Sequence, residues 1–232
     1  MHVPDEAAPV SNGPGAVAAR PGGPAGVAVV VPVRALEGAK SRLGAQLDAE
    51  ERQALVLALF ERVLEAARGT AGVGRVIVVS PDGEVLRRAA RAGALPLRQQ
   101  SGDLNAGLVQ AADLAAAMGV AAVLVLPADL PAINPAEVRR LVESASASAR
   151  PGRPLVALVP DRHGGGTNAL LVSPPRAIPF RFGEGSRSLH ATEARAAGAV
   201  YLELDGPLSL DIDTPDDLLL ADLAGLDHGD GR

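Results

Sequence analysis

The stretch VVVPVRALEGAKSRLG, residues 29–44, contains a strand, the point where it ends and the loop that follows. It opens with apolar β-branched residues, and Pro32 interrupts this run before a loop that carries Lys40 and Arg42. Lys40 is the only lysine in the chain, because the other basic residues among the 22 Lys and Arg are arginines. An apolar run that leads directly into a cationic loop is typical of a buried strand whose carboxyl end faces a ligand.

Similar apolar runs recur along the chain and alternate with amphipathic segments. We expect strands at residues 27–33, 75–79, 121–126, 154–159 and 200–204, and helices at residues 48–67, 83–91, 105–118, 135–145 and 215–224. Strands that are apolar on both faces belong to a parallel sheet covered by helices on both sides. The sequence therefore predicts a three-layer α/β/α domain of Rossmann-like type over residues 26–225. Residues 1–25 are expected to be a disordered leader, and residues 226–232 a flexible tail.

Composition excludes several classes of function. The net charge of -5 argues against nucleic acid as a partner, because phosphate backbones require a basic surface. Cysteine is absent, which excludes disulfides, thiolate zinc sites and a cysteine nucleophile. The longest apolar run, residues 27–33, is too short to span a bilayer, and residues 1–26 have no signal-peptide pattern. We therefore expect a cytoplasmic protein without a membrane partner.

The loop after the first strand is a candidate polyphosphate site. It is not a Walker A loop, because Arg34 and Ala39 stand where that pattern requires glycine. A strand-to-helix loop with Gly38, Lys40 and Arg42 can still offer backbone N–H groups and cationic side chains to phosphates. Lysine provides a compact charge on a flexible stem, unlike the rigid fork of arginine. The alternative is a solvated surface loop.

Acidic residues follow two further apolar segments. Asp129, in LPADLP (residues 126–131), comes at the end of a buried strand, where a carboxylate costs free energy unless it is paired or binds a metal. A hard divalent cation fits this carboxylate, and the alternative is a helix-capping role. Asp211 and Asp213 are two residues apart, so on an extended segment both side chains lie on the same face.

Three other loops carry polar groups. Residues 100–105 could contact a nucleobase edge, although an ordinary turn explains them equally well. Three glycines precede Thr167 and Asn168, and we expect these five residues to form a loop that a ligand can approach closely. Gly183 and Ser186 precede a helical stretch, which indicates either an anion site at a helix N-terminus or a serine N-cap.

Five motifs occur in order over residues 27–223: VPVRALEGAKSRLG, LPADLP, DRHGGGTNALLV, PFRFGEGS…H and LDIDTPDDL. Together they closely resemble the CofC/FbiD family, the guanylyltransferases of coenzyme F-420 biosynthesis. The resemblance implies a GT-A-type nucleotidyltransferase fold with a mostly parallel sheet. It also implies transfer of GMP from GTP to phosphoenolpyruvate, giving enolpyruvyl-2-diphospho-5'-guanosine and pyrophosphate. The chain is rich in arginine, alanine and glycine, which indicates a GC-rich genome and, within this family, the actinobacterial branch. Because that branch is associated with phosphoenolpyruvate, the resemblance favours this acceptor over 2-phospho-L-lactate or 3-phosphoglycerate.

The resemblance also implies roles for individual residues. Lys40 and Arg42 would hold the GTP phosphates, and Asn105 would help to recognise guanine. Asp129 and Asp213, assisted by Asp211, would hold Mg²⁺, with Mn²⁺ as a substitute. Thr167, Gly183 and Ser186 would bind the three-carbon phosphate acceptor. A homodimer is a further expectation.

The chain departs from the family pattern at three positions and leaves two alternative functions open. Arg34 stands where the family usually has lysine, Asp103 where it has glycine, and Arg187 where it has phenylalanine. A molybdopterin-type or sugar-phosphate nucleotidyltransferase would carry a Leu-x-Ala-Gly-Gly-x-Ser opening, which is missing. A non-catalytic nucleotide-binding module would not need the carboxylates of Asp129 and Asp213.

Overall fold

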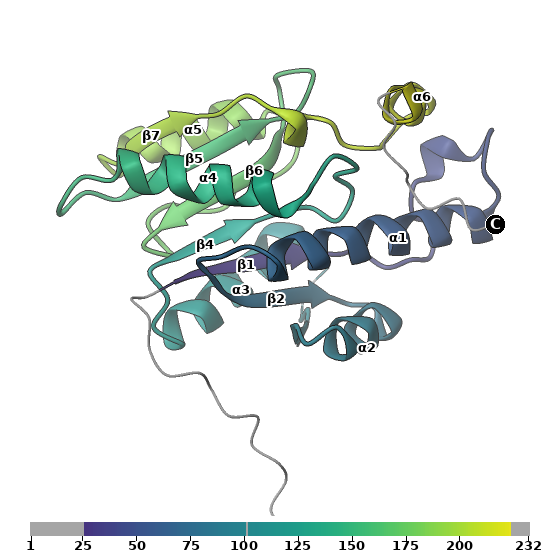
Figure 1. Cartoon of the computed structure of the whole chain (residues 1–232), viewed down its shortest axis with the longest axis horizontal. Coiled ribbons are helices and arrows are strands. Elements are labelled where there is room, and N and C mark those ends of the chain that lie inside the picture. Colours follow the sequence, from purple (N-terminus) through teal and green to yellow (C-terminus); the bar gives the residue numbers. More distant parts are fainter. Residues whose placement is uncertain (1–25, 101, 224–232) are drawn as a thin grey trace, which may run out of the picture.

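A computed structural model describes residues 26–100 and 102–223, so the predicted leader and tail lie outside the described part. These residues form a seven-stranded sheet with helices on both faces (Figure 1). The strands are β1 (Val27–Pro32), β2 (Val73–Ser80), β3 (Leu95–Arg98), β4 (Ala122–Val125), β5 (Leu155–Pro160), β6 (Thr167–Ser173) and β7 (Val200–Glu203). Their order is β3-β2-β1-β4-β6-β5-β7, and every pairing is parallel except the two made by β6. The predicted mostly parallel sheet is confirmed.

The helices cover the sheet as a three-layer fold requires. They are α1 (Ala49–Arg68), α2 (Gly83–Arg91), α3 (Leu104–Ala117), α4 (Pro135–Ser148), α5 (Ser186–Ala196) and α6 (Pro215–Leu223). Short 3₁₀ segments lie at η1 (Ser41–Leu43) and η2 (Pro207–Ser209). Four helices begin at a side chain that accepts backbone N–H bonds of the first turn, namely Asp48, Asp82, Asp103 and Asn134. The bounds of the predicted helices agree with the observed ones to within a few residues.

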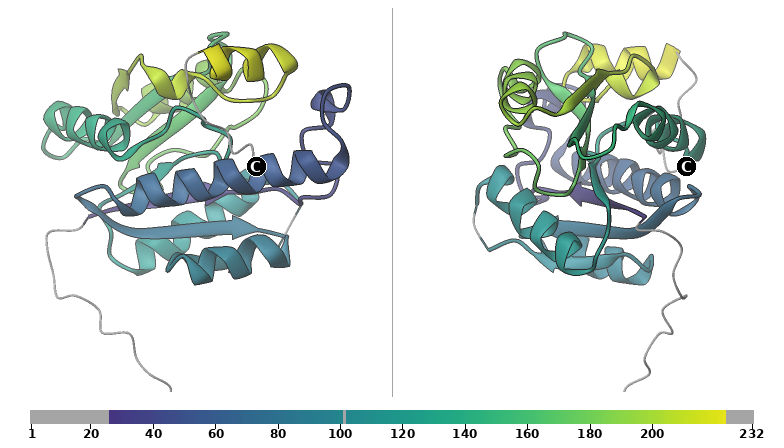
Figure 2. Two further views of the ribbon diagram at one scale, coloured as in Figure 1. Left: turned by 45° about the vertical axis from the view of Figure 1, so that its right-hand side comes forward. Right: turned by 90° about the vertical axis from the view of Figure 1, so that its left-hand side faces the viewer.

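Alternating side chains of β1 contribute to two separate cores. Val29 and Val31 pack in a cluster with residues of α1, α2 and α4, whereas Ala28 and Val30 pack with α3 and α5 on the opposite face (Figure 2). Phe60 of α1 is fully buried in the first cluster. Removing such a ring typically costs about 3–5 kcal/mol of stability.

A third, smaller core holds the functional loops together. Leu43 of η1 and Ile212, between the two late aspartates, are both fully buried and pack with Leu59 of α1 and Ala221 of α6. Leu43 and Ile212 are each within three residues of a predicted site residue. This cluster therefore anchors the Lys40 loop next to the Asp211–Asp213 segment.

Two strands were not predicted. β3 is short and contains Pro96, which is tolerated because β3 lies at an edge of the sheet. The expectation that Thr167 and Asn168 belong to a loop is wrong, because both are buried at the start of β6. β6 runs antiparallel to β4 and β5, so its first residues lie beside the carboxyl ends of β4 and β5. Two polar residues are thereby brought to the predicted ligand-binding edge.

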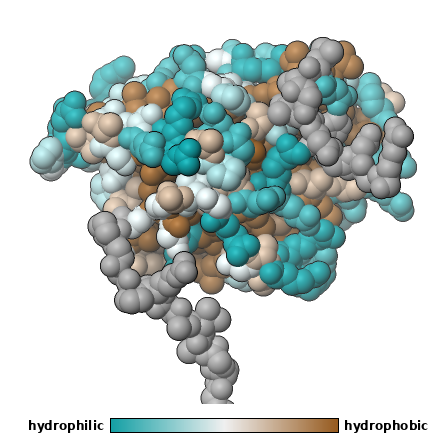
Figure 3. Space-filling view, in the orientation of Figure 1, coloured by the Kyte–Doolittle hydropathy of each residue, from teal (hydrophilic) through white to brown (hydrophobic). Residues whose placement is uncertain are grey.

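The surface is mixed in character. The face in Figure 3 carries hydrophilic residues interspersed with hydrophobic ones, and some of the latter gather near α6. On α6, Leu219 and Leu220 are exposed. Within residues 26–100 and 102–223, no helix is both long and apolar enough to cross a membrane.

Candidate active site

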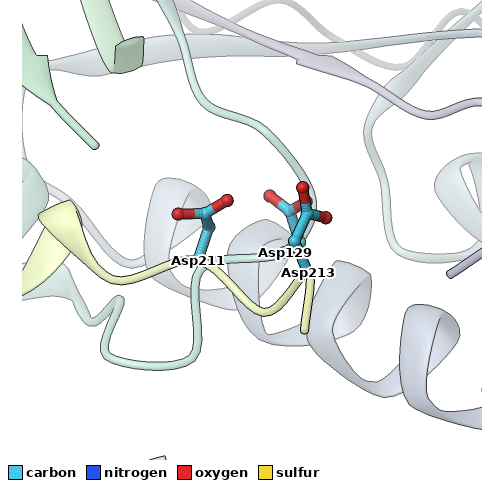
Figure 4. A group of neighbouring side chains, drawn as sticks. All are labelled: Asp129, Asp211 and Asp213. Carbon is cyan, nitrogen blue, oxygen red and sulfur yellow. The ribbon is translucent and has the colours of Figure 1, made fainter. Parts of the chain in front are cut away.

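Three carboxylates converge at the carboxyl end of the central strands. Asp129 follows β4, and Asp211 and Asp213 precede α6; one oxygen from each lies within 4.8 Å of the others (Figure 4). The backbone N–H of Ile212 donates to the carbonyl of Asp129 at 3.1 Å, which joins the two loops. Because Ile212 is buried, its two neighbours turn to the same side, as predicted. The N-cap of α4 is Asn134, so Asp129 is not the helix cap of the alternative interpretation.

The Lys40 side chain reaches into this acidic group. Its Nζ lies 2.6 Å from Asp129 Oδ2 and 2.8 Å from Asp213 Oδ1, and only 11% of the side chain is exposed. Burial lowers the pKa of Lys40, but the charges of Asp129 and Asp213 outweigh it and raise that pKa above its usual value. The Lys40 backbone is left-handed, with φ of 49°, a strained conformation that costs on the order of 1 kcal/mol. This turn directs the only lysine of the chain toward two of the three acids.

Arg42 lies at the outer side of the same group. Its guanidinium is 4.0 Å from Asp213 Oδ2, and 75% of its side chain is exposed. The exposed position leaves Arg42 accessible to a ligand that approaches the carboxylates from solvent.

Asp211 is the most strongly perturbed of the three acids. Burial, followed by the negative charge of Asp129, raises its pKa to about 6, and a hydrogen bond from Asn168 acts in the opposite direction. The Asn168 Nδ2 group lies 3.1 Å from Asp211 Oδ1 and also donates to the carbonyls of Leu208 and Ser209. Asn168 is nearly fully buried, so it holds both the Asp211 carboxylate and the η2 backbone in place.

Asp213 is positioned by a second buried residue, Asp217. Asp217 Oδ2 accepts hydrogen bonds from the backbone N–H groups of Asp213 at 3.0 Å and Thr214 at 2.7 Å. Asp217 Oδ1 accepts a hydrogen bond from Arg162 Nε at 2.6 Å. Burial raises the pKa of Asp217, but these hydrogen bonds and the charge of Arg162 outweigh it and lower that pKa. Asp216 and Asp217 both lie in the first turn of α6, but only Asp217 is buried.

A cavity of about 630 Å³ lies beside the carboxylates. Its lining includes five residues that the sequence pointed to, namely Asn105, Thr167, Asn168, Gly183 and Ser186, together with Arg34 and Asp103. Asn168 lines the cavity and donates a hydrogen bond to Asp211, so the cavity and the acidic group are adjacent.

Thr167 and Ser186 form a buried hydroxyl pair at the wall of this cavity. Ser186 Oγ donates to Thr167 Oγ1 at 3.0 Å, and His190 Nδ1 lies 3.1 Å from the same Thr167 oxygen. α5 begins at Ser186 with Gly185 as N-cap, so the alternative of a serine N-cap is wrong. His190 has no exposed surface, and its ring packs edge-on against Phe182 at 5.0 Å between centroids.

Asn105 uses both ends of its side-chain amide on the protein backbone. Its Oδ1 accepts from Phe182 N–H at 2.8 Å, and its Nδ2 donates to the Phe182 carbonyl at 3.1 Å. In this structure Asn105 therefore joins α3 to the segment that carries Gly183.

Two of the three departures from the family pattern have clear structural roles. Asp103 caps α3 by accepting the N–H groups of Asn105 and Ala106. The Arg187 guanidinium pairs with Glu203 at 2.6 Å and donates to the Gly164 carbonyl, which fixes the glycine-rich loop before β6. Nothing in the structure explains arginine at position 34.

Sequence reasoning missed the contacts of four residues that support the site. It expected Asn168 in a ligand-facing loop and not at Asp211, and it gave no role at the site to Arg162, His190 and Asp217. The polar start of an otherwise apolar strand could have indicated Asn168. The others act through contacts between segments 9 to 55 residues apart in the chain, which no local pattern encodes.

Solved structures identify the class of fold. The chain superposes on a putative nucleotide-diphospho-sugar transferase from Desulfovibrio desulfuricans with a TM-score of 0.66 and 18% identity, covering 83% of this chain and 84% of that one. It also resembles CMP:2-keto-3-deoxy-manno-octonic acid synthetase, with a TM-score of 0.56 and 18% identity, covering 86% and 98% of the two chains. The fold is that of the α/β nucleotidyltransferases.

Sequence comparison then identifies the family. Residues 27–231 match the family described as guanylyl transferase CofC like. The chain is 45% identical to the phosphoenolpyruvate guanylyltransferase of Rubrobacter xylanophilus, covering 86% of this chain and 95% of the relative. It is 47% identical to the protein of that name from Sphaerobacter thermophilus, covering 84% and 91%. The chain belongs to the CofC-like guanylyl transferase family and is a nucleotidyltransferase. The two alternative functions are not favoured by these matches.

Proposed function

We propose that the protein transfers GMP from GTP to phosphoenolpyruvate, releasing pyrophosphate, as a step of coenzyme F-420 biosynthesis. The observation that carries this proposal is the 45% identity to a phosphoenolpyruvate guanylyltransferase, over 86% of this chain and 95% of that relative. An acidic cluster next to a cavity supports it, because nucleotidyl transfer depends on charge neutralisation at phosphate. The substrates are cytoplasmic metabolites, so we place the reaction in the cytoplasm.

The bond changes require no general base from the protein. An oxygen of the acceptor phosphate, already ionised at neutral pH, attacks the α-phosphorus of GTP. The bond from this phosphorus to the oxygen that bridges the α- and β-phosphates breaks, and pyrophosphate leaves with that oxygen. Positioning and charge neutralisation therefore account for catalysis.

The carboxylates of Asp129, Asp211 and Asp213 suit a hard divalent cation, which we assign as Mg²⁺ with Mn²⁺ as a substitute. The fit rests on three convergent carboxylates, one of which, Asp211, has a raised pKa because it is buried and because the negative charge of Asp129 is close. Such a cation, when bound, neutralises charge on the α-phosphate and on the incoming phosphate oxygen. Asn168 and Asp217 would keep two of the ligands oriented.

Lys40 and Arg42 are assigned to the GTP phosphates. In this structure Lys40 neutralises Asp129 and Asp213, so a divalent cation and the Lys40 ammonium compete for the same oxygens. A lysine displaced from these carboxylates has a flexible stem on which to follow the negative charge of the triphosphate. Arg42 is exposed and adds a second cation at the outer side of the site.

The cavity provides the remaining contacts. Thr167, Gly183 and Ser186 are assigned to the acceptor, because hydroxyl groups and a glycine backbone suit phosphate and carboxylate oxygens. Asn105 is assigned to the guanine side, where it acts by holding the Phe182 backbone.

Pyrophosphate release by the purified protein tests the proposal. With GTP and Mg²⁺, we expect release with phosphoenolpyruvate and much less with 2-phospho-L-lactate or 3-phosphoglycerate. The Asp129→Asn variant should lose turnover while remaining folded, since the change preserves side-chain size. Release only with another acceptor would overturn the substrate assignment, and GTP binding without any release would overturn the activity.

A further inference from the structure

The hydrogen bonds around His190 determine which ring nitrogen carries the proton. The backbone N–H of Arg181 donates to His190 Nε2 at 3.0 Å, and a ring nitrogen that accepts a hydrogen bond carries no proton. Burial lowers the pKa of His190 to about 4, so the ring is neutral at neutral pH. Its single N–H is therefore on Nδ1, which donates to Thr167 Oγ1.

This tautomer sets the polarity of the Thr167 hydroxyl. The Thr167 oxygen accepts hydrogen bonds from both His190 Nδ1 and Ser186 Oγ, which leaves its own hydrogen available to donate. Thr167 lines the cavity, and an anionic oxygen there would require a donor. With the opposite tautomer, the hydroxyl would donate to Nδ1 and would present only lone pairs to the anion.

His190 does not contact the cavity itself. It has no exposed surface, it is not among the residues that line the cavity, and both ring nitrogens have partners in the protein. A role as general base or metal ligand is thereby excluded in this arrangement.

We propose that His190 is a positioning residue that holds the Thr167 hydroxyl as a hydrogen-bond donor to an oxyanion of the small phosphate acceptor. This inference rests on the proposed function, since it concerns the acceptor of that reaction. It adds a specificity element that acts from behind the cavity wall, through Thr167.

The kinetics of four variants test this positioning role of His190: His190→Leu, His190→Asn, Thr167→Val and the double variant Thr167→Val/His190→Leu. His190→Leu should lower kcat/KM for phosphoenolpyruvate by about 10-fold to 100-fold, with KM for GTP nearly unchanged. Asparagine carries an amide N–H near the position of Nδ1, so His190→Asn should recover part of the loss. The double variant should be no worse than Thr167→Val, because His190 acts through Thr167.

Thr192→Ala is the matched control on the same helix, where the hydroxyl donates only to the Ser188 carbonyl. This variant should have wild-type kinetics. Full activity of His190→Leu, or losses that add fully in the double variant, would overturn the proposal.

The tautomer is measured independently of activity by ¹⁵N NMR of the histidine side chains in the wild-type protein. We expect one histidine at pH 7 with a protonated Nδ1 and an unprotonated Nε2, whose signals disappear in His190→Asn. An Nε2–H tautomer for His190 would overturn the proposal even if the variants fail to fold. Wild-type protein without turnover on any acceptor would contradict the proposed function, and the NMR result would still decide the state of His190.

Discussion

Lys40 Nζ lies 2.6 Å from Asp129 Oδ2, although 89 positions separate the two residues in the chain. The same ammonium lies 2.8 Å from Asp213 Oδ1, so it bridges the loop after β4 and the segment before α6. Two carboxylates this close together repel each other unless a cation lies between them. The contact shows that the only lysine of the chain neutralises two of the three carboxylates of this group, which is the basis of the proposed competition between Lys40 and a divalent cation.

The Lys40→Met variant should bind Mg²⁺ more tightly than the wild type when GTP is absent, because the competing ammonium is gone. Turnover should nevertheless fall by about 100-fold, since a cation for the triphosphate is lost. Calorimetric titration with Mg²⁺ measures the first effect, and pyrophosphate release measures the second.

Arg42→Met is the matched control for this prediction. Arg42 is exposed and lies 4.0 Å from Asp213, so its removal should change Mg²⁺ affinity little and turnover less than Lys40→Met does. Weaker Mg²⁺ binding by Lys40→Met than by the wild type would contradict competition between the two cations.

The Asp217→Asn variant should weaken Mg²⁺ binding by about 10-fold, because Asp217 holds the backbone of Asp213. It should also lower the free energy of unfolding by about 2 kcal/mol, since it breaks the partly buried ion pair with Arg162. Urea unfolding and calorimetry measure the two effects.

Asp216→Asn provides the control, because Asp216 occupies the same first turn of α6 but is exposed. It should leave Mg²⁺ affinity unchanged. Equal effects of the two substitutions would show that the charge of the turn, and not the contact of Asp217 with Asp213, matters.

The Asn168→Ala variant should reduce Mg²⁺ affinity and the free energy of unfolding together. Asn168 is the donor to Asp211 Oδ1 and to the carbonyls of Leu208 and Ser209, and leaving buried acceptors without a donor costs about 1–3 kcal/mol. Asn134→Ala, which removes the N-cap of α4, should cost about 1 kcal/mol without affecting Mg²⁺. Wild-type Mg²⁺ affinity of Asn168→Ala would refute a positioning role.

The sequence predicts the layers of the fold and the position of Asp129 well, and the reasons are physical. Apolar runs such as β1 and β4 must be buried, and parallel strands bring the residues after them to one edge of the sheet. That rule brings Asp129 to this edge, and the two-residue period of an extended chain puts Asp211 and Asp213 on one face. Only the resemblance to the family implied that the three carboxylates meet.

The remaining features depend on contacts between distant segments, which local patterns do not encode. Nothing in the strand from Thr167 to Ser173 signals that it runs antiparallel, because its apolar residues suit either direction. The sequence likewise does not show which residues contact the Lys40 ammonium, or which nitrogen of the His190 ring carries the proton. The completed fold determines both properties, because it places Asp129 next to Lys40 and the Arg181 backbone N–H next to His190.

The buried, neutral state of His190 predicts how stability depends on pH. Its pKa is about 4 in the folded protein and about 6.5 when unfolded, so the unfolded chain binds more protons between these values. Stability from this group is therefore fully present above pH 6.5 and is lost as the pH falls toward 4, by about 3 kcal/mol at most. Burial is the main cause of the lowered pKa; the negative charge of Glu193 opposes it, and the positive charge of Arg181 acts in the same direction as burial. Urea unfolding between pH 4 and 7.5 should show this slope in the wild type and a smaller one in His190→Asn, which cannot titrate. Equal slopes in the two proteins would mean that His190 is not held neutral by the fold.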